Sequence, residues 1–290
     1  MAKKLAKDPK LYEAMQIQIN NLIHKGYATK IEAANLQDSP KTWYLPIFIA
    51  LNPNKPQKLR LVWDAASKSN GKSLNDFLLS GPDLLQPLVQ VLLSFRTGKI
   101  AICGDIAEMF HRINISKDDA QAQRFLWMEN PKSLKPSIYV MTALSFGMSC
   151  APFIAHYVRD FNADKFSKKY PIAVKSIKCH HYVDDMIDCA DTDQDALELA
   201  NQVSNIHQHG GFHIRNWISN SPEVLQSLAK NADCTGTKEW ELESNKVLGM
   251  YWDAANDVFR YNCRFARLRR NVFENDINPT RVSPSTYVNL

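Results

Sequence analysis

Two adjacent acidic residues, Asp184 and Asp185, interrupt a strand-like apolar stretch that has Val183 before them and Ile187 after them. Two-residue hairpin turns favour Asn-Gly or Asp-Gly, because these residues tolerate a positive φ. Asp-Asp is a poorer turn, and two like charges about 4 Å apart repel by about 4 kcal/mol at an effective dielectric constant near 20. Divalent cations would reverse the sign of this interaction, so the pair is a candidate metal-binding element.

Asp105 is a possible third acid, because it follows a short apolar strand at Ile100–Cys103. Three acids from two strand ends can hold two Mg²⁺ ions about 3.5–4 Å apart, one activating an attacking hydroxyl and one stabilising the leaving oxygen. Ligand sets made only of oxygen suit Mg²⁺ or Mn²⁺ better than zinc. Spacing alone leaves a second interpretation open, in which Asp184 and Asp185 form a solvated turn and Asp105 caps a helix.

The composition is that of a folded protein. Of the 290 residues, 45% are hydrophobic and 22% are charged, which excludes wholesale disorder. Lys and Arg number 35 against 30 Asp and Glu, a net charge of +5 that is compatible with a polyanionic partner. Six cysteines without a CxxC pair argue against a zinc ribbon and predict reduced thiols in an intracellular protein. No secretory signal or membrane-length apolar run of about 18 residues is visible, so no membrane association is expected.

The elements that must position the acids alternate between helices and hairpins. Hairpins in place of regular βαβ units favour the α+β class. The predicted helices are residues 8–37 with a break near Gly26, 83–96, 192–209 with Thr192 as N-cap, and a short one opened by Ser221. The predicted strands are residues 44–51, 59–63, 100–103 and 212–217, with hairpins at 177–190 and at 247–261.

Seven sequence blocks occur in a fixed order along residues 8–270. They are Trp43–Pro46, Asn52–Pro56, Leu59–Ala66, Gly104–Phe110, Leu144–Pro152, Tyr182–Asp185 and Leu248–Trp252. On these blocks the chain resembles reverse transcriptases, and most closely those of Bel/Pao-type LTR retrotransposons. Seven blocks in order are far more specific than any one of them.

The resemblance implies the right-hand polymerase fold, with an antiparallel palm sheet backed by helices, a fingers subdomain and an incomplete thumb. It divides the chain into an N-terminal helical segment (1–40), fingers and palm (41–255), and a truncated start of the thumb or a divergent tail (256–290). Asp105, Asp184 and Asp185 match the catalytic, metal-binding acids, which would hold two Mg²⁺ ions, with Mn²⁺ as a possible substitute.

The resemblance also implies a site for the deoxynucleotide triphosphate (dNTP). Phe110 matches the steric gate, an aromatic face that leaves no room for a 2′-hydroxyl. If the resemblance is set aside, the alternative interpretation of Phe110 is an ordinary core phenylalanine. Phe146-Gly147 falls where many retroviral enzymes carry Gln-Gly, and phenylalanine cannot make the polar contacts of glutamine. Gly147 would allow the backbone to approach the nucleotide closely.

Basic residues of the first hairpin complete that expected site. Arg60 matches an arginine that contacts the triphosphate, and its planar fork suits two phosphate oxygens. Its partner lysine is Lys55 or Lys58, of which Lys55 is preferred. From charge alone, the same residues also fit a solvated basic turn.

The last block, Leu248–Trp252, matches the primer grip, with Gly249, Met250 and Tyr251 positioning the primer 3′-hydroxyl. One position departs from the family. The strand after Gly211 often carries a lysine that could protonate pyrophosphate, whereas this chain has Arg215 and Asn216. Asn216 has no proton to give at neutral pH, and arginine is a poor acid because its pKa exceeds about 12.

The function implied is that of an RNA-directed DNA polymerase domain of a retrotransposon, adding dNTPs to a primer 3′-hydroxyl on an RNA or DNA template. The rest of a retrotransposon polyprotein is expected but is not visible in these residues. The implied location is a cytoplasmic virus-like particle or the nucleus. The alternative is a catalytically inactive, truncated relic that at most binds nucleic acid.

Overall fold

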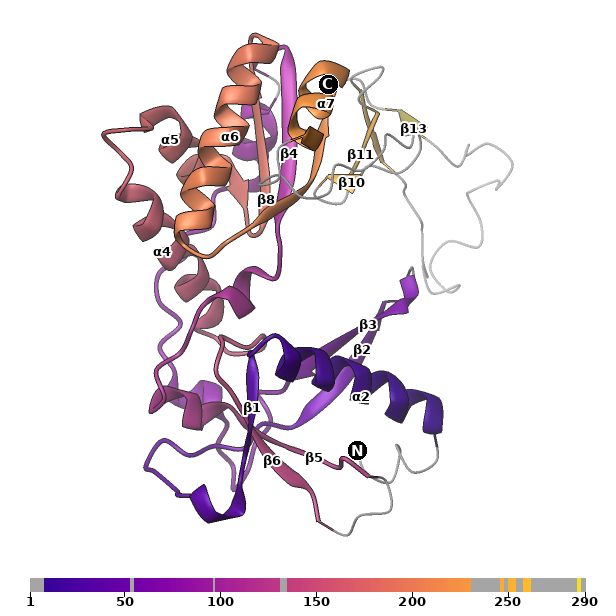
Figure 1. Ribbon diagram of the computed structural model, residues 1–290, viewed down its shortest axis with the longest axis vertical. Helices are drawn as coiled ribbons and strands as arrows, with labels where there is room; N and C mark the ends of the chain where they lie inside the picture. The colour runs from indigo at the N-terminus through magenta and orange to yellow at the C-terminus, as the bar shows by residue number, and fades with distance from the viewer. Residues whose placement is uncertain are drawn as a thin grey trace, which may run out of the picture. The chain divides into compact units, whose positions relative to one another are not determined.

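The computed structural model describes residues 8–52, 55–95, 97–130 and 135–230, with four short strands beyond them. The chain divides into two compact units, one formed by residues 1–84 and 108–159 and the other by residues 85–107 and 160–290 (Figure 1). None of the helices in the described part is long and apolar enough to span a membrane.

The first unit contains a three-stranded antiparallel sheet and a separate hairpin. The sheet has the order β1-β6-β5, and β2 pairs with β3 to form the hairpin. Its elements are α2 (Pro9–His24), β1 (Ala28–Ile31), η1 (Ala33–Asn35), β2 (Ile47–Asn52), β3 (Lys55–Trp63), η2 (Leu74–Phe77), η3 (Met109–Arg112), η4 (Asp119–Gln123), β5 (Arg124–Trp127), β6 (Ser137–Met141) and the first part of α4 (Ala151–Asp164).

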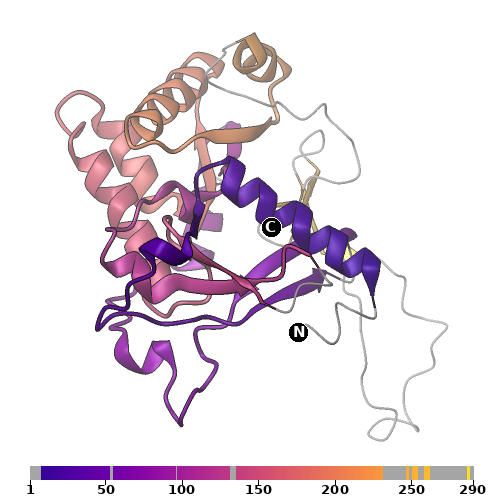
Figure 2. The same cartoon turned by 60° about the horizontal axis from the view of Figure 1, so that its bottom comes forward.

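Local signals explain the first helix but not the strand after it. Asp8 caps α2 by accepting a hydrogen bond from the Leu11 amide, and Met15 and Ile19 are fully buried. The helix contacts β1 and β3 and is the long indigo helix of Figure 2. The prediction of helix beyond Gly26 is wrong, because residues 28–31 form β1 and pair with β6. That partner lies far along the chain, so a local helical period could not reveal it.

The second unit is built on a four-stranded antiparallel sheet of order β7-β8-β4-β9. The strands are β7 (His181–Tyr182), β8 (Asp185–Ala190), β4 (Ile100–Ile106) and β9 (Ile214–Ser219). The helices are α3 (Leu88–Ser94), α5 (Pro171–Cys179), α6 (Asp193–His209) and α7 (Pro222–Lys230). Helix α6 contacts β4 and β8 (Figure 1). Helix α7 contacts β9 and α5 contacts β7, which confirms an antiparallel sheet backed by helices.

One face of this sheet is covered by α3 and by β11 (Met250–Asp253). Cys103 and Ile187 are partners on β4 and β8, and they are buried together with Phe95 and Trp252. The Phe95 and Trp252 rings meet edge to face at 5.0 Å between centroids. Because alternate strand residues share a face, Asp105 is the next residue on this covered face after Cys103.

Two further sequence predictions are settled by the described strands and helices. The helix expected at 83–96 is limited to Leu88–Ser94, because Pro87 disfavours helical backbone in the residue before it. The last hairpin is confirmed: β11 (Met250–Asp253) pairs with β10 (Lys246–Val247) and with β12 (Val258–Tyr261), which pairs with β13 (Thr286–Tyr287).

Candidate active site

Asp105 and Asp185 lie directly opposite each other in the sheet of the second unit. Asp105 on β4 is the register partner of Asp185 on β8. Opposed residues of an antiparallel pair have Cα atoms about 4.5–5.5 Å apart and side chains on the same face. The register therefore places on one face two acids that are widely separated in the sequence.

Asp184 sits in the tight turn between β7 and β8. Tyr182 pairs with Asp185, so Val183 and Asp184 are the two loop residues. Val183 has φ +57, a conformation that is rare for a β-branched residue and costs of order 1–3 kcal/mol. The amide of Ile106 donates a 2.7 Å hydrogen bond to the Asp184 carbonyl, which ties the strained turn to β4.

The negative charges of these three acids act on one another. Burial raises the pKa of the Asp185 carboxyl to about 7, and repulsion from Asp184 and Asp105 adds to the shift. With this pKa the Asp185 carboxyl keeps its proton up to near-neutral pH, because no positive charge in the described part of the chain compensates its ionised form. A cation is the group that would compensate it.

Asp105 has hydrogen-bond partners on its other side, from β9. The Nε atom of Arg215 donates to Oδ2 of Asp105 at 3.1 Å, and the side-chain amide of Asn216 donates to Oδ1. In the sequence, both residues stand out because they lie where the family often has a lysine. The sequence gives no sign of their contact with Asp105. The signal it lacked is an irregularity in the pairing of β9.

That irregularity is a β-bulge. Between two register pairs, β4 advances two residues, from Cys103 to Asp105, while β9 advances three, from Ile218 to Arg215. Asn216 lies in the bulge at φ +55. On β4, Gly104 lies between the two paired residues, and an added Cβ there would lie 2.6 Å from the side chain of Ile214.

The donor chemistry of the three acids fits a divalent metal ion. Carboxylate oxygens are the ligands that Mg²⁺ and Mn²⁺ prefer. Burial, and after it the charges of Asp184 and Asp105, raise the pKa of Asp185, and a bound cation would oppose both effects. Within the described ranges, no three His, Cys, Asp or Glu side chains are already gathered as ligands of one ion.

In the first unit, Phe110 and Phe146 form an aromatic pair. Their ring centroids are 4.7 Å apart, and His111 meets the Phe146 ring edge to face at 5.2 Å. Phe146 remains 40% exposed. The ring of Phe110, the residue predicted to be the steric gate, is thus braced by the ring of Phe146.

Gly147 is required by a close approach of two backbones. It has φ +102, and an added Cβ would overlap the carbonyl oxygen of Trp63 at the end of β3. Its own carbonyl accepts a hydrogen bond from the side-chain amide of Asn75 at 3.3 Å. The glycine holds the loop of residues 145–149 against β3.

The remaining predicted site residues lie on hairpins. Arg60 is exposed on β3, opposite Ala50. Lys55 begins the same strand, and Met250 and Tyr251 lie on β11, but their side chains are outside what the structure describes. Gly249 also lies outside the described residues.

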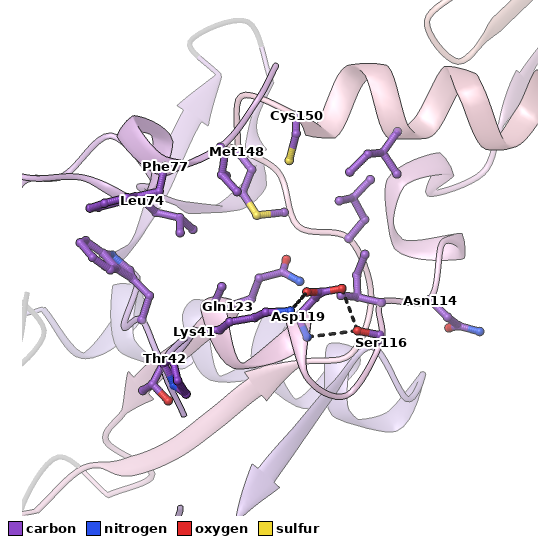
Figure 3. Close-up of a pocket in the computed structure, with 17 residues that line it drawn as sticks. Lys41, Thr42, Leu74, Phe77, Asn114, Ser116, Asp119, Gln123, Met148 and Cys150 are labelled. Carbon is purple, nitrogen blue, oxygen red and sulfur yellow. Dashed lines mark hydrogen bonds and ion pairs between the residues drawn. The ribbon is translucent and has the colours of Figure 1, made fainter. Parts of the chain in front are cut away.

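The first unit also contains a cavity of about 680 Å³ (Figure 3). Its wall is largely apolar and includes Trp43, Phe77 and Met148. At its polar edge, Asp119 accepts hydrogen bonds from Lys41 at 2.7 Å and from Ser116 at 2.8 Å. None of the predicted site residues lines this cavity.

The structure thus places Asp105 and Asp185 as a pair on adjacent antiparallel strands, with Asp184 in the neighbouring β7–β8 turn. The sequence matches the family described as reverse transcriptase (RNA-dependent DNA polymerase) over residues 58–216, more than half of the chain. The chain belongs to this family.

Solved structures with a similar fold include those of foamy viral proteins. The foamy viral protease-reverse transcriptase in complex with RNA/DNA hybrid has a TM-score of 0.52 and 20% identity, over 71% of this chain and 23% of that chain. The native Prototype Foamy Virus protease-reverse transcriptase has a TM-score of 0.51 and 20% identity, over 71% and 24%. The chain spans about a quarter of the length of these proteins. No curated protein matches the sequence.

These similarities confirm the predicted fold class. The described residues form a mixed α and β structure with antiparallel sheets, similar to the polymerase fold of retroviral reverse transcriptases. Identities near 20% support a shared fold and nothing more. Conclusions about activity and partners therefore have to be argued from the residues of this chain.

Proposed function

We propose that this chain is the RNA-directed DNA polymerase domain of a Bel/Pao-type LTR retrotransposon. It adds dNTPs to a primer 3′-hydroxyl on an RNA or DNA template. The observation that carries the proposal is the register of Asp105 against Asp185, beside the turn that holds Asp184, in a member of the reverse transcriptase family.

In this proposal Asp105, Asp184 and Asp185 hold the divalent cations, Mg²⁺ or in its place Mn²⁺. When bound, such ions activate the primer hydroxyl and stabilise charge on the transferred phosphate. The sheet fixes the backbones of two of the three acids by direct pairing, so only side-chain rotation is needed to bring their carboxylates to one place. Most of the rate then comes from positioning and charge stabilisation.

The nucleotide is held by residues of the first unit. Arg60 and Lys55 bind the triphosphate by charge and by donated hydrogen bonds. Phe110, braced by Phe146, lies under the sugar and excludes a 2′-hydroxyl. Gly147 keeps its loop close to β3, so that the loop backbone forms part of the nucleotide site.

The primer is positioned by Gly249, Met250 and Tyr251 around β11. Residues 1–40 act as an N-terminal helical segment, 41–255 as fingers and palm, and 256–290 as the start of a thumb or a divergent tail. The chain works within a longer polyprotein, in a virus-like particle or in the nucleus.

The test is incorporation of dTTP on poly(rA)–oligo(dT) by the purified chain, with Mg²⁺ or Mn²⁺. We expect Asp184→Asn and Asp105→Asn each to lower the rate at least about a thousand-fold, because the cations lose a charged ligand. Asp193→Asn is the matched control, since Asp193 is an exposed acid of the same unit at the start of α6. Equal rates for wild type and Asp184→Asn would refute the assignment of the acids.

A second candidate is a catalytically inactive fragment that binds nucleic acid. Asn216 favours it, because its amide contacts Asp105 but has no ionisable proton to give to pyrophosphate. Salt-dependent RNA binding without incorporation at any metal concentration would support this candidate. Detectable primer extension would exclude it.

A further inference from the structure

The carboxylate of Asp105 already has a cationic partner within the chain. Arg215 donates to one oxygen at 3.1 Å as an ion pair, and Asn216 donates to the other. The side chain of Asp105 is 24% exposed and that of Arg215 is 46% exposed, so the pair is partly shielded from water. Both carboxylate oxygens are therefore engaged before any metal ion arrives.

The sheet places Asp105 between opposite charges. Its register partner on β8 is Asp185, and its register partner on β9 is Arg215. Register partners share a face, so one carboxylate has a negative neighbour on one side and a positive neighbour on the other. The hydrogen bonds from Arg215 and Asn216 show that the carboxylate is turned toward the positive side.

The bulge in β9 is what allows two consecutive residues to reach Asp105. In a regular strand Arg215 and Asn216 would point to opposite faces. The extra residue of β9 and the positive φ of Asn216 bring both side chains to the same carboxylate.

We propose that Arg215 is an internal counter-cation, which holds Asp105 in its metal-free position and competes with the divalent ion for this carboxylate. The inference rests on the proposed role of Asp105 as a metal ligand. Arg215 is then a positioning residue that acts through Asp105. Because the ion gains Asp105 only as Arg215 releases it, the metal affinity is lowered by the strength of the pair.

The test is the binding of Mn²⁺ to the full chain without nucleotide or template. Binding is measured from the electron paramagnetic resonance signal of free Mn²⁺ at fixed pH and ionic strength. We expect Arg215→Gln to lower the dissociation constant about three- to five-fold, the upper part of the range set by a partly exposed ion pair. Arg215→Lys keeps the charge and is expected to stay within about two-fold of wild type.

Lys178→Gln is the matched control. Lys178 lies in the same unit, is 41% exposed and pairs with Asp164 at 2.9 Å, so its loss removes the same charge away from the acids. We expect it to leave the dissociation constant nearly unchanged. An equal change in Lys178→Gln and Arg215→Gln, or unchanged or weaker binding by Arg215→Gln, would overturn the inference.

Thermal unfolding provides a second readout. The metal-free Arg215→Gln chain is expected to melt at a lower temperature than wild type, because Asp105 loses its ion-pair partner. Its rise in melting temperature on addition of Mn²⁺ is expected to be larger. A smaller rise would contradict the competition.

The same binding data separate this inference from the proposed function. Asp185→Asn is expected to abolish saturable Mn²⁺ binding. If wild type binds no Mn²⁺, or if Asp185→Asn binds as well as wild type, both the metal-site assignment and the inference fail. If binding depends on Asp185 and is indifferent to Arg215, the inference alone fails.

Discussion

Asp185 is the acid whose environment opposes its charge most clearly. Its ordinary pKa of 3.8 rises to about 7 through burial and through the neighbouring Asp184 and Asp105. Between about pH 4 and 7 the folded chain therefore binds more protons at this site than the unfolded chain does. The contribution of Asp185 to the free energy of unfolding consequently falls as the pH rises through this interval, and it levels off above pH 7.

The pH prediction is a difference between two melting curves. From pH 5 to pH 8 without metal, the melting temperature of wild type should fall relative to Asp185→Asn by roughly 2–6 °C. Calorimetry or circular dichroism measures it. Asp193→Asn should follow wild type across the interval. Parallel curves for wild type and Asp185→Asn would contradict the origin assigned to the pKa shift.

Phe146 offers a test of nucleotide selection. Aromatic pairs contribute about 0.5–1.5 kcal/mol, so removing the ring that braces Phe110 should loosen the gate. We expect Phe146→Ala to raise the incorporation of ribonucleotides relative to deoxynucleotides about two- to ten-fold, measured as a ratio of kcat/KM values.

Two variants control for effects unrelated to the gate. Phe146→Tyr keeps the ring and should keep the ratio. Phe161→Ala removes a half-exposed ring from α4 and should not change selectivity. If the Phe146→Ala enzyme is active and its ratio of ribonucleotide to deoxynucleotide incorporation is unchanged, the Phe146 ring does not contribute to selection by Phe110.

At the scale of elements, the turns carry conformations that few residues tolerate. The β7–β8 turn places Val183 at φ +57, where a hairpin of this kind would ordinarily have glycine. The turn survives because the Asp184 carbonyl is bound by β4 and because Tyr182 and Asp185 pair beside it. The strain is concentrated where the acids are, as is common at functional sites.

Gly147 and Gly71 separate two reasons for needing glycine. Both have positive φ, but an added Cβ overlaps the Trp63 carbonyl at Gly147 and meets open space at Gly71. Gly71→Ala should cost about 1 kcal/mol, which reflects backbone conformation alone. Gly147→Ala should cost at least about 2 kcal/mol more, because β3 has to move. Chemical denaturation measures both, and equal losses would contradict the close approach.

At the scale of the whole molecule, elements with local signals were the predictable ones. Thr192 caps α6 by accepting from the Asp195 amide, and Ser221 caps α7 by accepting from the Val224 amide, both as the sequence predicts. Strand β1 was not predictable, because its pairing with β6 is a long-range contact that no local period records. Long-range pairing is the part of a fold that a single sequence encodes least visibly.

The candidate site shows the same division. The spacing and types of Asp105, Asp184 and Asp185 identified them as candidates, but only the strand register places the first opposite the third. The contact of Arg215 and Asn216 with Asp105 depends on one extra residue in β9. Neither arginine nor asparagine at these positions predicts a β-bulge. The Phe110–Phe146 pair also joins segments whose proximity the sequence does not state.

The hydrogen bond from the Ile106 amide to the Asp184 carbonyl gives the protein a natural reporter. This amide can exchange its hydrogen for deuterium only when the acidic turn lifts from its neighbouring strand. Its exchange rate therefore records how often the turn opens, and an ion that fastens the turn would slow that exchange without any nucleotide being consumed.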